Sequence, residues 1–261
     1  MVFKEAGRIK KAANTKTINT RVEARKYSND LKNSIGNLYN LSNKILIIFL
    51  VSINTILFDL DGTLIDTAPD LAYALNTLLA ENDLREKPYH EIKPLVAMGG
   101  KALVSYGFEM DEQHPDFGAH HQRILQIYRD NIDKHSKLFD GIERLLEWIK
   151  TQQMFWGVVT NKPESLTHLL LDKMDLSPDV VVCGDTLEFN KPHPAPLEYA
   201  CAQLGVLKDS VLFVGDDKND MLAGRAAKIK TVAVDYGYGQ IAKDWDYDCL
   251  ITHPDEIRRM I

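Results

Sequence analysis

The octapeptide Ile-Leu-Phe-Asp-Leu-Asp-Gly-Thr at residues 56–63 joins a short apolar run to two carboxylates that stand two positions apart. Side chains two positions apart on a strand point to the same side, and a strand covered on both faces is apolar throughout. The run therefore predicts a buried parallel strand with Asp59 and Asp61 together at its carboxyl end. Open α/β sheets bind ligands at that end, and Gly62 allows the chain to turn away from it.

Five further apolar runs predict the other strands of the same sheet. Helical stripes at i, i+3, i+4 and i+7 lie between them, as at Ile142, Leu145, Leu146 and Ile149. Strands that alternate with helices indicate an α/β fold, here a Rossmann-like parallel sheet with helices on both faces. The predicted strands cover residues 53–58, 155–160, 180–183, 211–214, 231–234 and 249–251.

The interval between the first two predicted strands is long and holds helical patterns without a convincing strand. We interpret it as an insertion. We predict a helical cap domain at residues 66–140 and a catalytic core made of residues 52–65 and 141–261. The helical stripes of the cap are Leu71, Leu75, Leu78 and Leu79 in one segment, and Ile124, Ile127 and Tyr128 in another.

The first 51 residues differ from the rest in composition. Residues 1–44 hold ten Lys or Arg against three acidic residues, whereas residues 45–261 hold 21 against 34. The segment has almost no apolar periodicity, so it cannot bury enough surface to offset the entropy of ordering it. We expect residues 1–51 to be a disordered extension. Our preferred hypothesis is a native start at Val51, and an organellar transit peptide is the alternative.

Composition excludes several classes of partner. The net charge of −6 gives no positive field for nucleic acid. The apolar run at residues 45–58 is interrupted by polar residues and falls short of the roughly 20 residues that span a membrane. We expect neither nucleic acid nor membrane as a partner. The three cysteines form no CxxC pair, which fits free thiols in the cytoplasm.

The paired acids predict a nucleophile and a cation. A carboxylate with an ordinary pKa of about 3.9 is ionised at neutral pH and attacks phosphorus without a base to activate it. Each like-charged pair at about 4 Å costs about 4 kcal/mol at an effective dielectric near 20. A phosphate dianion facing Asp59 and Asp61 therefore requires a cation, and Mg²⁺ is a hard ion that prefers oxygen ligands.

The ends of the other strands supply the remaining groups. Thr160 and Asn161 follow the second strand and offer a hydroxyl and backbone amides to phosphoryl oxygens. Lys191 lies beyond the third strand and offers a point positive charge. Asp216 follows the fourth strand and is placed to bind metal. Asp217 is either a residue near the metal or a solvated acid.

This order of motifs resembles the haloacid dehalogenase superfamily, whose signature is DxDGT, a Thr, an isolated Lys and GDxxxD. The resemblance makes Asp59 the nucleophile and a Mg²⁺ ligand, and Asp61 the acid and base that also lends its backbone carbonyl to the metal. It makes Thr160 and Lys191 the phosphoryl-binding residues and Asp216 a Mg²⁺ ligand. Asp220 is then expected to support the site from outside the metal shell.

The resemblance also narrows the chemistry to phosphatases. The second acid, Asp61, is absent from dehalogenases and phosphonatases, and the position of the cap is that of the phosphoglycolate phosphatase and β-phosphoglucomutase group. The stretch at residues 66–71 is similar to phosphoglycolate phosphatases. Residues 98–102, 135–139 and 155–163 look like the branch that acts on N-acetylmuramic acid 6-phosphate.

We therefore expect a Mg²⁺-dependent phosphomonoesterase that acts on 2-phosphoglycolate or N-acetylmuramic acid 6-phosphate through an aspartyl-phosphate. A phosphomutase with the same intermediate is the first alternative. A non-catalytic binding protein on the same fold is the second, although it would be expected to have lost a catalytic position. The sequence leaves the oligomeric state open.

Overall fold

The computed structural model describes residues 52–239, 241, 242 and 244–261, so the disordered extension predicted for residues 1–51 lies outside the described part. Six strands form one sheet in the order β5-β4-β1-β6-β7-β8. Every neighbouring pair in it is parallel. The strands are β1 (Thr55–Phe58), β4 (Phe155–Val159), β5 (Val180–Val182), β6 (Val211–Gly215), β7 (Lys230–Val234) and β8 (Cys249–Ile251).

These six strands confirm the six predicted ones to within two residues at each end. The central strand β1 shows why the runs are continuous. Ile56 and Phe58 belong to the apolar cluster on one side of the sheet, and Leu57 between them belongs to the cluster on the other side. Because both faces are covered, every position of β1 is buried, as expected for a parallel strand.

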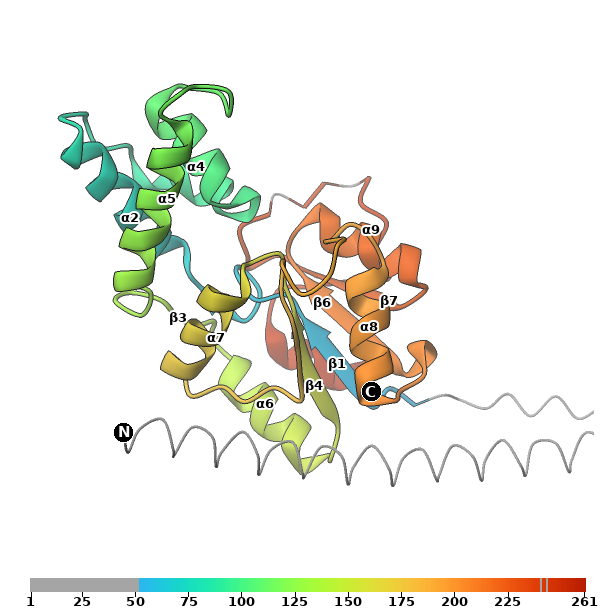
Figure 1. The fold of residues 1–261 in the computed structure, drawn as a ribbon. Helices are drawn as coiled ribbons and strands as arrows, with labels where there is room; N and C mark the ends of the chain where they lie inside the picture. The colour runs from blue at the N-terminus through green and yellow to red at the C-terminus, as the bar shows by residue number, and fades with distance from the viewer. Residues whose placement is uncertain (1–51, 240, 243) are drawn as a thin grey trace, which may run out of the picture.

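Helices of the core cover both faces of the sheet (Figure 1). Apolar residues of α6 and α7 pack with Ile56 and Phe58, whereas those of α8 and α9 pack with Leu57. Within the described part of the chain, no helix is long and apolar enough to cross a membrane. The core helices are α6 (Ile142–Thr151), α7 (Glu164–Lys173), α8 (Ala195–Leu204), η2 (Lys208–Ser210), α9 (Lys218–Ala227) and η3 (Pro254–Arg259).

A second group of helices lies beyond the carboxyl ends of the strands and apart from the sheet (Figure 1). This group comprises α2 (Ala68–Glu81), α3 (Tyr89–Ile92), η1 (Lys93–Met98), α4 (Gly99–Phe108) and α5 (Phe117–Asp130). The helical content agrees with the predicted insertion. The domain boundary at residues 66–140 remains our proposal, and we call this segment the cap.

The chain enters and leaves the cap through a pair of strands that the sequence did not predict. They are β2 (Ile65–Asp66) and β3 (Lys137–Leu138), and they pair antiparallel with Ile65 opposite Leu138. Two residues each are too few to show the alternation by which a strand is recognised. The pair holds the two linkers of the cap side by side.

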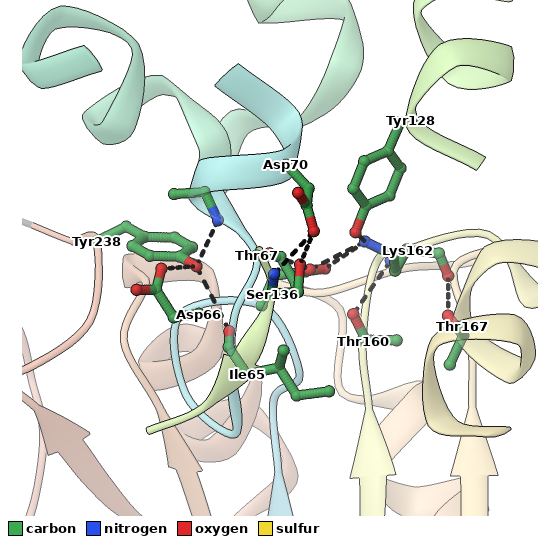
Figure 2. A network of polar contacts seen from close by, with 12 residues as sticks. Ile65, Asp66, Thr67, Asp70, Tyr128, Ser136, Thr160, Lys162, Thr167 and Tyr238 are labelled. Carbon is green, nitrogen blue, oxygen red and sulfur yellow. Dashed lines mark hydrogen bonds and ion pairs between the residues drawn. The ribbon is translucent and has the colours of Figure 1, made fainter. Parts of the chain in front are cut away.

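A buried carboxylate fastens the same two linkers. Asp70, in the first turn of α2, is fully buried. It accepts hydrogen bonds from the backbone N–H of His135 at 2.9 Å and from the backbone N–H and hydroxyl of Ser136 at 2.8 and 2.7 Å. Three donors from the second linker thus converge on one side chain from the first helix of the cap, and Figure 2 shows Ser136 beside Asp70.

We expect Asp70→Ala to lower the free energy of unfolding by about 3 kcal/mol, because it leaves buried donors unpaired at a cost of about 1–3 kcal/mol each. Urea unfolding followed by circular dichroism measures the change. The matched control is Asp172→Ala, which removes an exposed carboxylate from α7 and should change stability by less than about 0.5 kcal/mol. Equal stabilities for the two variants would contradict this role of Asp70.

Candidate active site

The predicted site residues meet at the carboxyl edge of the sheet. Asp59 follows β1, Thr160 follows β4, Asp216 follows β6 and Lys191 precedes α8. Together they line a cavity of about 390 Å³. Its other wall comes from the cap and includes Val96, Met98, Leu125 and Tyr128. The cavity therefore has a charged floor on the core and a mostly apolar wall on the cap.

Asp59 is placed by the central strand. Its backbone N–H donates to Val214 O at 2.8 Å, which continues the β1–β6 ladder by one bond. Its carboxylate lies 2.7 Å from Lys191 Nζ, and only 8% of the residue is exposed. Burial raises the pKa of Asp59 above its ordinary value, and the nearby Lys191 opposes the rise. The carboxylate thus stands in a water-poor site with one strong cationic partner.

Lys191 is a buried cation that pairs with two carboxylates. Its Nζ lies 2.7 Å from Asp59 Oδ1 and 2.7 Å from Asp220 Oδ1. Burial lowers the pKa of a lysine, but the charges of Asp220 and Asp59 outweigh this effect and raise it. Lys191 is therefore charged and already fixed at the strand ends, where a phosphoryl oxygen would lie.

Asp216 is buried among donors. Its carboxylate accepts from the Thr63 hydroxyl at 3.0 Å and from the backbone N–H of Tyr238 at 2.8 Å. Burial, reinforced by the charge of Asp59, raises the pKa of Asp216 to about 7. The chain passes very close to this carboxylate: Gly62 has φ +85°, and a Cβ there would come within 2.2 Å of Asp216 Oδ2.

These carboxylates fit a divalent metal ion. Oxygens of Asp59, Asp216 and Asp220 lie within 4.8 Å of one another, and all three residues are buried. Burial is the main cause that raises the pKa of each of these carboxylates, and the charges of neighbouring acids add to the rise. A bound cation would offset both effects. Hard oxygen ligands of this kind suit Mg²⁺. Lys191 bonds to both Asp59 and Asp220, so this contact does not choose between them. The assignment of Asp59 and Asp216 to the metal, with Asp220 outside its shell, follows the family resemblance and remains our proposal.

We expect Asp216→Asn to stabilise the protein at pH 8 when Mg²⁺ is removed by EDTA. The pKa of Asp216 is about 7 in the folded protein, against an ordinary value of 3.8. The proton that the folded protein binds more tightly stabilises it at low pH, and this stabilisation is lost as the pH rises between the two values. At about 1.4 kcal/mol per pKa unit, and allowing for relaxation, the variant should gain about 2 kcal/mol. The Thr63 hydroxyl can turn to accept from the new amide.

Urea unfolding at pH 8 and pH 5 measures this gain, which should shrink at the lower pH. Mg²⁺ added at pH 8 should stabilise the wild type and leave the variant unchanged, since a ligand stabilises only the protein that binds it. A variant less stable than the wild type at both pH values would show that the Asp216 charge is not disfavoured by its surroundings.

Asp61 lies beside Asp59 and has two partners. Its Oδ1 accepts from the Thr67 hydroxyl at 2.6 Å and from Lys162 Nζ at 2.9 Å. Thr67 stands at the N-terminus of α2 but does not cap it, since its hydroxyl is used for Asp61. The carboxylate is thus held by one group from the core and one from the start of the cap.

Thr160 and Asn161 occupy different positions relative to the cavity. Thr160 is buried, and its hydroxyl oxygen accepts from the backbone N–H of Lys162 at 3.2 Å, which leaves the hydroxyl proton free to point into the cavity. The side chain of Asn161 instead pairs with the backbone of Lys191, donating at 2.9 Å and accepting at 3.1 Å. Asn161 therefore places Lys191, and only its backbone amide remains for a phosphoryl oxygen.

Asp217 and Asp220 form the N-terminal cap of α9. Asp217 accepts from the backbone N–H of Asn219 at 2.8 Å, and Asp220 accepts from the backbone N–H of Asp217 at 3.1 Å. This is a reciprocal capping box. The sequence left Asp217 open between a residue near the metal and a solvated acid, and its hydrogen bonds give it a different role, that of a helix cap.

Sequence reasoning missed the contributions of Lys162 and Tyr238. Lys162 binds Asp61, and Tyr238 binds Asp216 through its backbone and Asp66 through its hydroxyl at 2.9 Å. Tyr238 lies in the Gly237-Tyr238-Gly239 stretch, which follows β7. Its glycines are required because a Cβ at Gly239 would meet Asp216 O at 1.8 Å. A GxG directly after a strand was the available signal for that close approach.

The sequence matches the family described as haloacid dehalogenase-like hydrolase over residues 56–234. This range begins in β1 and ends with β7, so it contains each of the strand ends described above. Both the charged floor of the cavity and its cap wall lie within the match.

Similar proteins carry phosphatase names. The N-acetylmuramic acid 6-phosphate phosphatase of Pseudomonas putida is 37% identical over 214 residues, which cover 80% of this chain and 96% of that protein. The phosphoglycolate phosphatase of Xanthomonas campestris is 36% identical over 210 residues, which cover 77% and 93%. A crystal structure titled as a predicted phosphoglycolate phosphatase from Haemophilus somnus aligns with a TM-score of 0.71 at 28% identity, covering 80% and 97%.

Proposed function

The chain belongs to the haloacid dehalogenase-like hydrolases and is a phosphoric monoester hydrolase, and we propose that it releases phosphate from a small metabolite through a phospho-aspartate on Asp59. The observation that carries the proposal is the meeting of Asp59, Lys191 and Asp61 in one cavity between the core and the cap. Lys191 Nζ lies 2.7 Å from the proposed nucleophile.

In the first half-reaction an oxygen of Asp59 forms a bond to phosphorus as the bond to the ester oxygen breaks. Lys191 and Thr160 are proposed to hold the phosphoryl oxygens, together with the backbone amide of Asn161. Asp61 gives its proton to the departing oxygen. Such proton transfer by a positioned group contributes about 10²–10⁴-fold in rate.

In the second half-reaction Asp61 takes a proton from water, whose oxygen attacks phosphorus and frees Asp59. Asp61 can serve as the acid and then as the base, because giving up its proton in the first step leaves the carboxylate that accepts a proton in the second. The cap wall of the cavity limits the access of bulk water during the first step.

The proposed metal is Mg²⁺, held by the carboxylates of Asp59 and Asp216 and by the backbone carbonyl of Asp61. When bound, it supplies positive charge that offsets the repulsion between these carboxylates and the phosphate dianion. Asp220 is proposed to act from outside the metal shell by fixing Lys191, to which it bonds at 2.7 Å.

The substrate is proposed to be 2-phosphoglycolate or N-acetylmuramic acid 6-phosphate, on the strength of the names of the relatives. The experiment is Mg²⁺-dependent phosphate release from both compounds in parallel, compared as kcat/KM, which measures discrimination between substrates. Preference for one identifies the substrate class. Failure to release phosphate from either compound or from p-nitrophenyl phosphate would refute the phosphatase proposal.

We also propose a cytoplasmic location, which the three free cysteines support.

A further inference from the structure

Lys162 is a buried lysine that the proposed mechanism does not use. It follows β4 in the loop that carries Thr160, and only 9% of the residue is exposed. Lysine is almost never buried unless its charge is paired, since an ammonium group taken out of water costs several kcal/mol without compensation. The partners of its ammonium group therefore indicate what the residue does.

Two partners account for the ammonium group. Lys162 Nζ lies 2.9 Å from Asp61 Oδ1 and 3.2 Å from Asp61 Oδ2, and 2.9 Å from the hydroxyl oxygen of Tyr128. Tyr128 comes from α5 of the cap and is 1% exposed. Burial raises the pKa of the Tyr128 hydroxyl to about 12, so it stays neutral and accepts from the ammonium group. Figure 2 shows Lys162 between Tyr128 of the cap and the core loop.

Lys162 restrains a rotation of the Asp61 carboxylate that the hydrogen bond from Thr67 leaves free. Thr67 donates to Oδ1 alone, and a carboxylate held at one oxygen can still swing about that bond. Lys162, which lies in the loop after β4, contacts both oxygens of the Asp61 carboxylate. The two contacts together define the plane of the carboxylate, and useful acid catalysis depends on such placement because reaction geometry tolerates little error.

We propose that Lys162 is a positioning residue for Asp61, and that Tyr128 holds Lys162 in place so that the cap takes part in aiming the acid. The inference rests on the proposed function, because it presumes that Asp61 is the acid and base. It goes beyond that function in giving Lys162 and Tyr128 a role in the chemistry without a contact to the transferred phosphoryl group.

A double-mutant cycle tests the proposal, with phenyl phosphate as the substrate, saturating Mg²⁺ and kcat/KM as the readout. Phenolate is a basic leaving group that benefits from protonation. We expect Lys162→Met to lower kcat/KM by about 30-fold when Asp61 is present, within the range of acid–base contributions, and by less than about twofold in the Asp61→Asn background. Two residues that act through one another show this non-additivity.

A second cycle keeps the test independent of how well Lys162→Met folds. Tyr128→Phe retains the ring and removes only the hydroxyl; it should lower kcat/KM by about fivefold, and by less than about twofold once Lys162→Met is present. The surface control is Lys173→Met, which removes a lysine from α7 that is 49% exposed and paired with Asp133 at 3.1 Å. Its kcat/KM should equal that of the wild type.

The outcomes separate the inference from the function on which it rests. If Lys162→Met lowers kcat/KM by the same factor with and without Asp61, Lys162 acts independently of the acid and the inference is overturned. If Asp61→Asn itself leaves kcat/KM unchanged, the acid–base assignment fails, and the inference fails with it. If Asp61→Asn lowers kcat/KM and Lys162→Met then lowers it no further, the result supports both the acid–base role of Asp61 and the positioning role of Lys162.

Discussion

Asp59→Asn is expected to lower the rate of Mg²⁺-dependent phosphate release by at least about 10⁴-fold, the scale on which removal of a covalent nucleophile acts. Asparagine has nearly the shape of aspartate but no charged oxygen with which to attack phosphorus. The fold should persist, because Lys191 keeps its contact with Asp220 at 2.7 Å and because removing one acid relieves the repulsion on Asp216.

Rapid acid quench with radiolabelled phosphate ester provides the direct test. The wild type should carry label on the protein during turnover, and Asp59→Asn should carry none. The matched control is Asp217→Asn at the same edge of the sheet, which should retain full activity because asparagine caps a helix as well as aspartate does. Label on the Asp59→Asn protein would place the nucleophile elsewhere.

The fold could be predicted because its strands carry a simple signal. β1, β4 and β6 are covered on both faces and, apart from Thr55 at the start of β1, hold no polar side chain, so a continuous apolar run marks each of them. Parallel strands end at one edge, and the residues after each run are brought together by that rule alone. Asp59, Thr160 and Asp216 were found in this way, without any knowledge of side-chain contacts.

The partners within the site could not be predicted, because they depend on contacts between distant segments. The bond from Lys162 to Asp61 joins residues 101 positions apart, and the one from Tyr128 comes from a helix of the cap. Nothing in the Thr-Asn-Lys sequence says which of its polar side chains faces the cavity. Asn161 was expected to offer its backbone amide to phosphate, and nothing in its pattern indicated that its side chain would bind the backbone of Lys191.

One local feature was available in the sequence and was not used. Asp217 directly precedes α9 and Asp220 lies three positions later in its first turn, which is the spacing of a capping box. This pattern indicates a helix start and favours a cap over a metal ligand. By contrast, β2 and β3 were too short to leave a pattern, and their pairing is a tertiary contact between the two ends of the cap.

Lys191→Met is expected both to unfold more easily and to lose activity. Lys191 lies between the buried carboxylates of Asp59 and Asp220, with 3% of its side chain exposed. Removing one member of a buried ion pair costs about 3–5 kcal/mol, since it leaves buried charge without compensation. The loss of a preorganised charge at the phosphoryl group should lower kcat by about 10²–10³-fold.

The stability loss should depend on pH in a direction that identifies its cause. Burial raises the pKa of Asp59 and of Asp220, and Lys191 opposes both rises. Without the lysine both pKa values rise further, so the folded variant binds protons that the unfolded chain has released, and its stability falls as the pH rises. The deficit measured by urea unfolding in EDTA should therefore be larger at pH 8 than at pH 5.

The control for this prediction is Lys208→Met, which breaks an exposed pair with Glu198 and should cost less than about 1 kcal/mol at either pH. A deficit for Lys191→Met that is the same at pH 5 and pH 8 would mean that the lost packing of its side chain, and not the uncompensated acids, destabilises the variant. The pH dependence matters for the mechanism, because it measures how strongly these carboxylates require a cation before any phosphate enters the cavity.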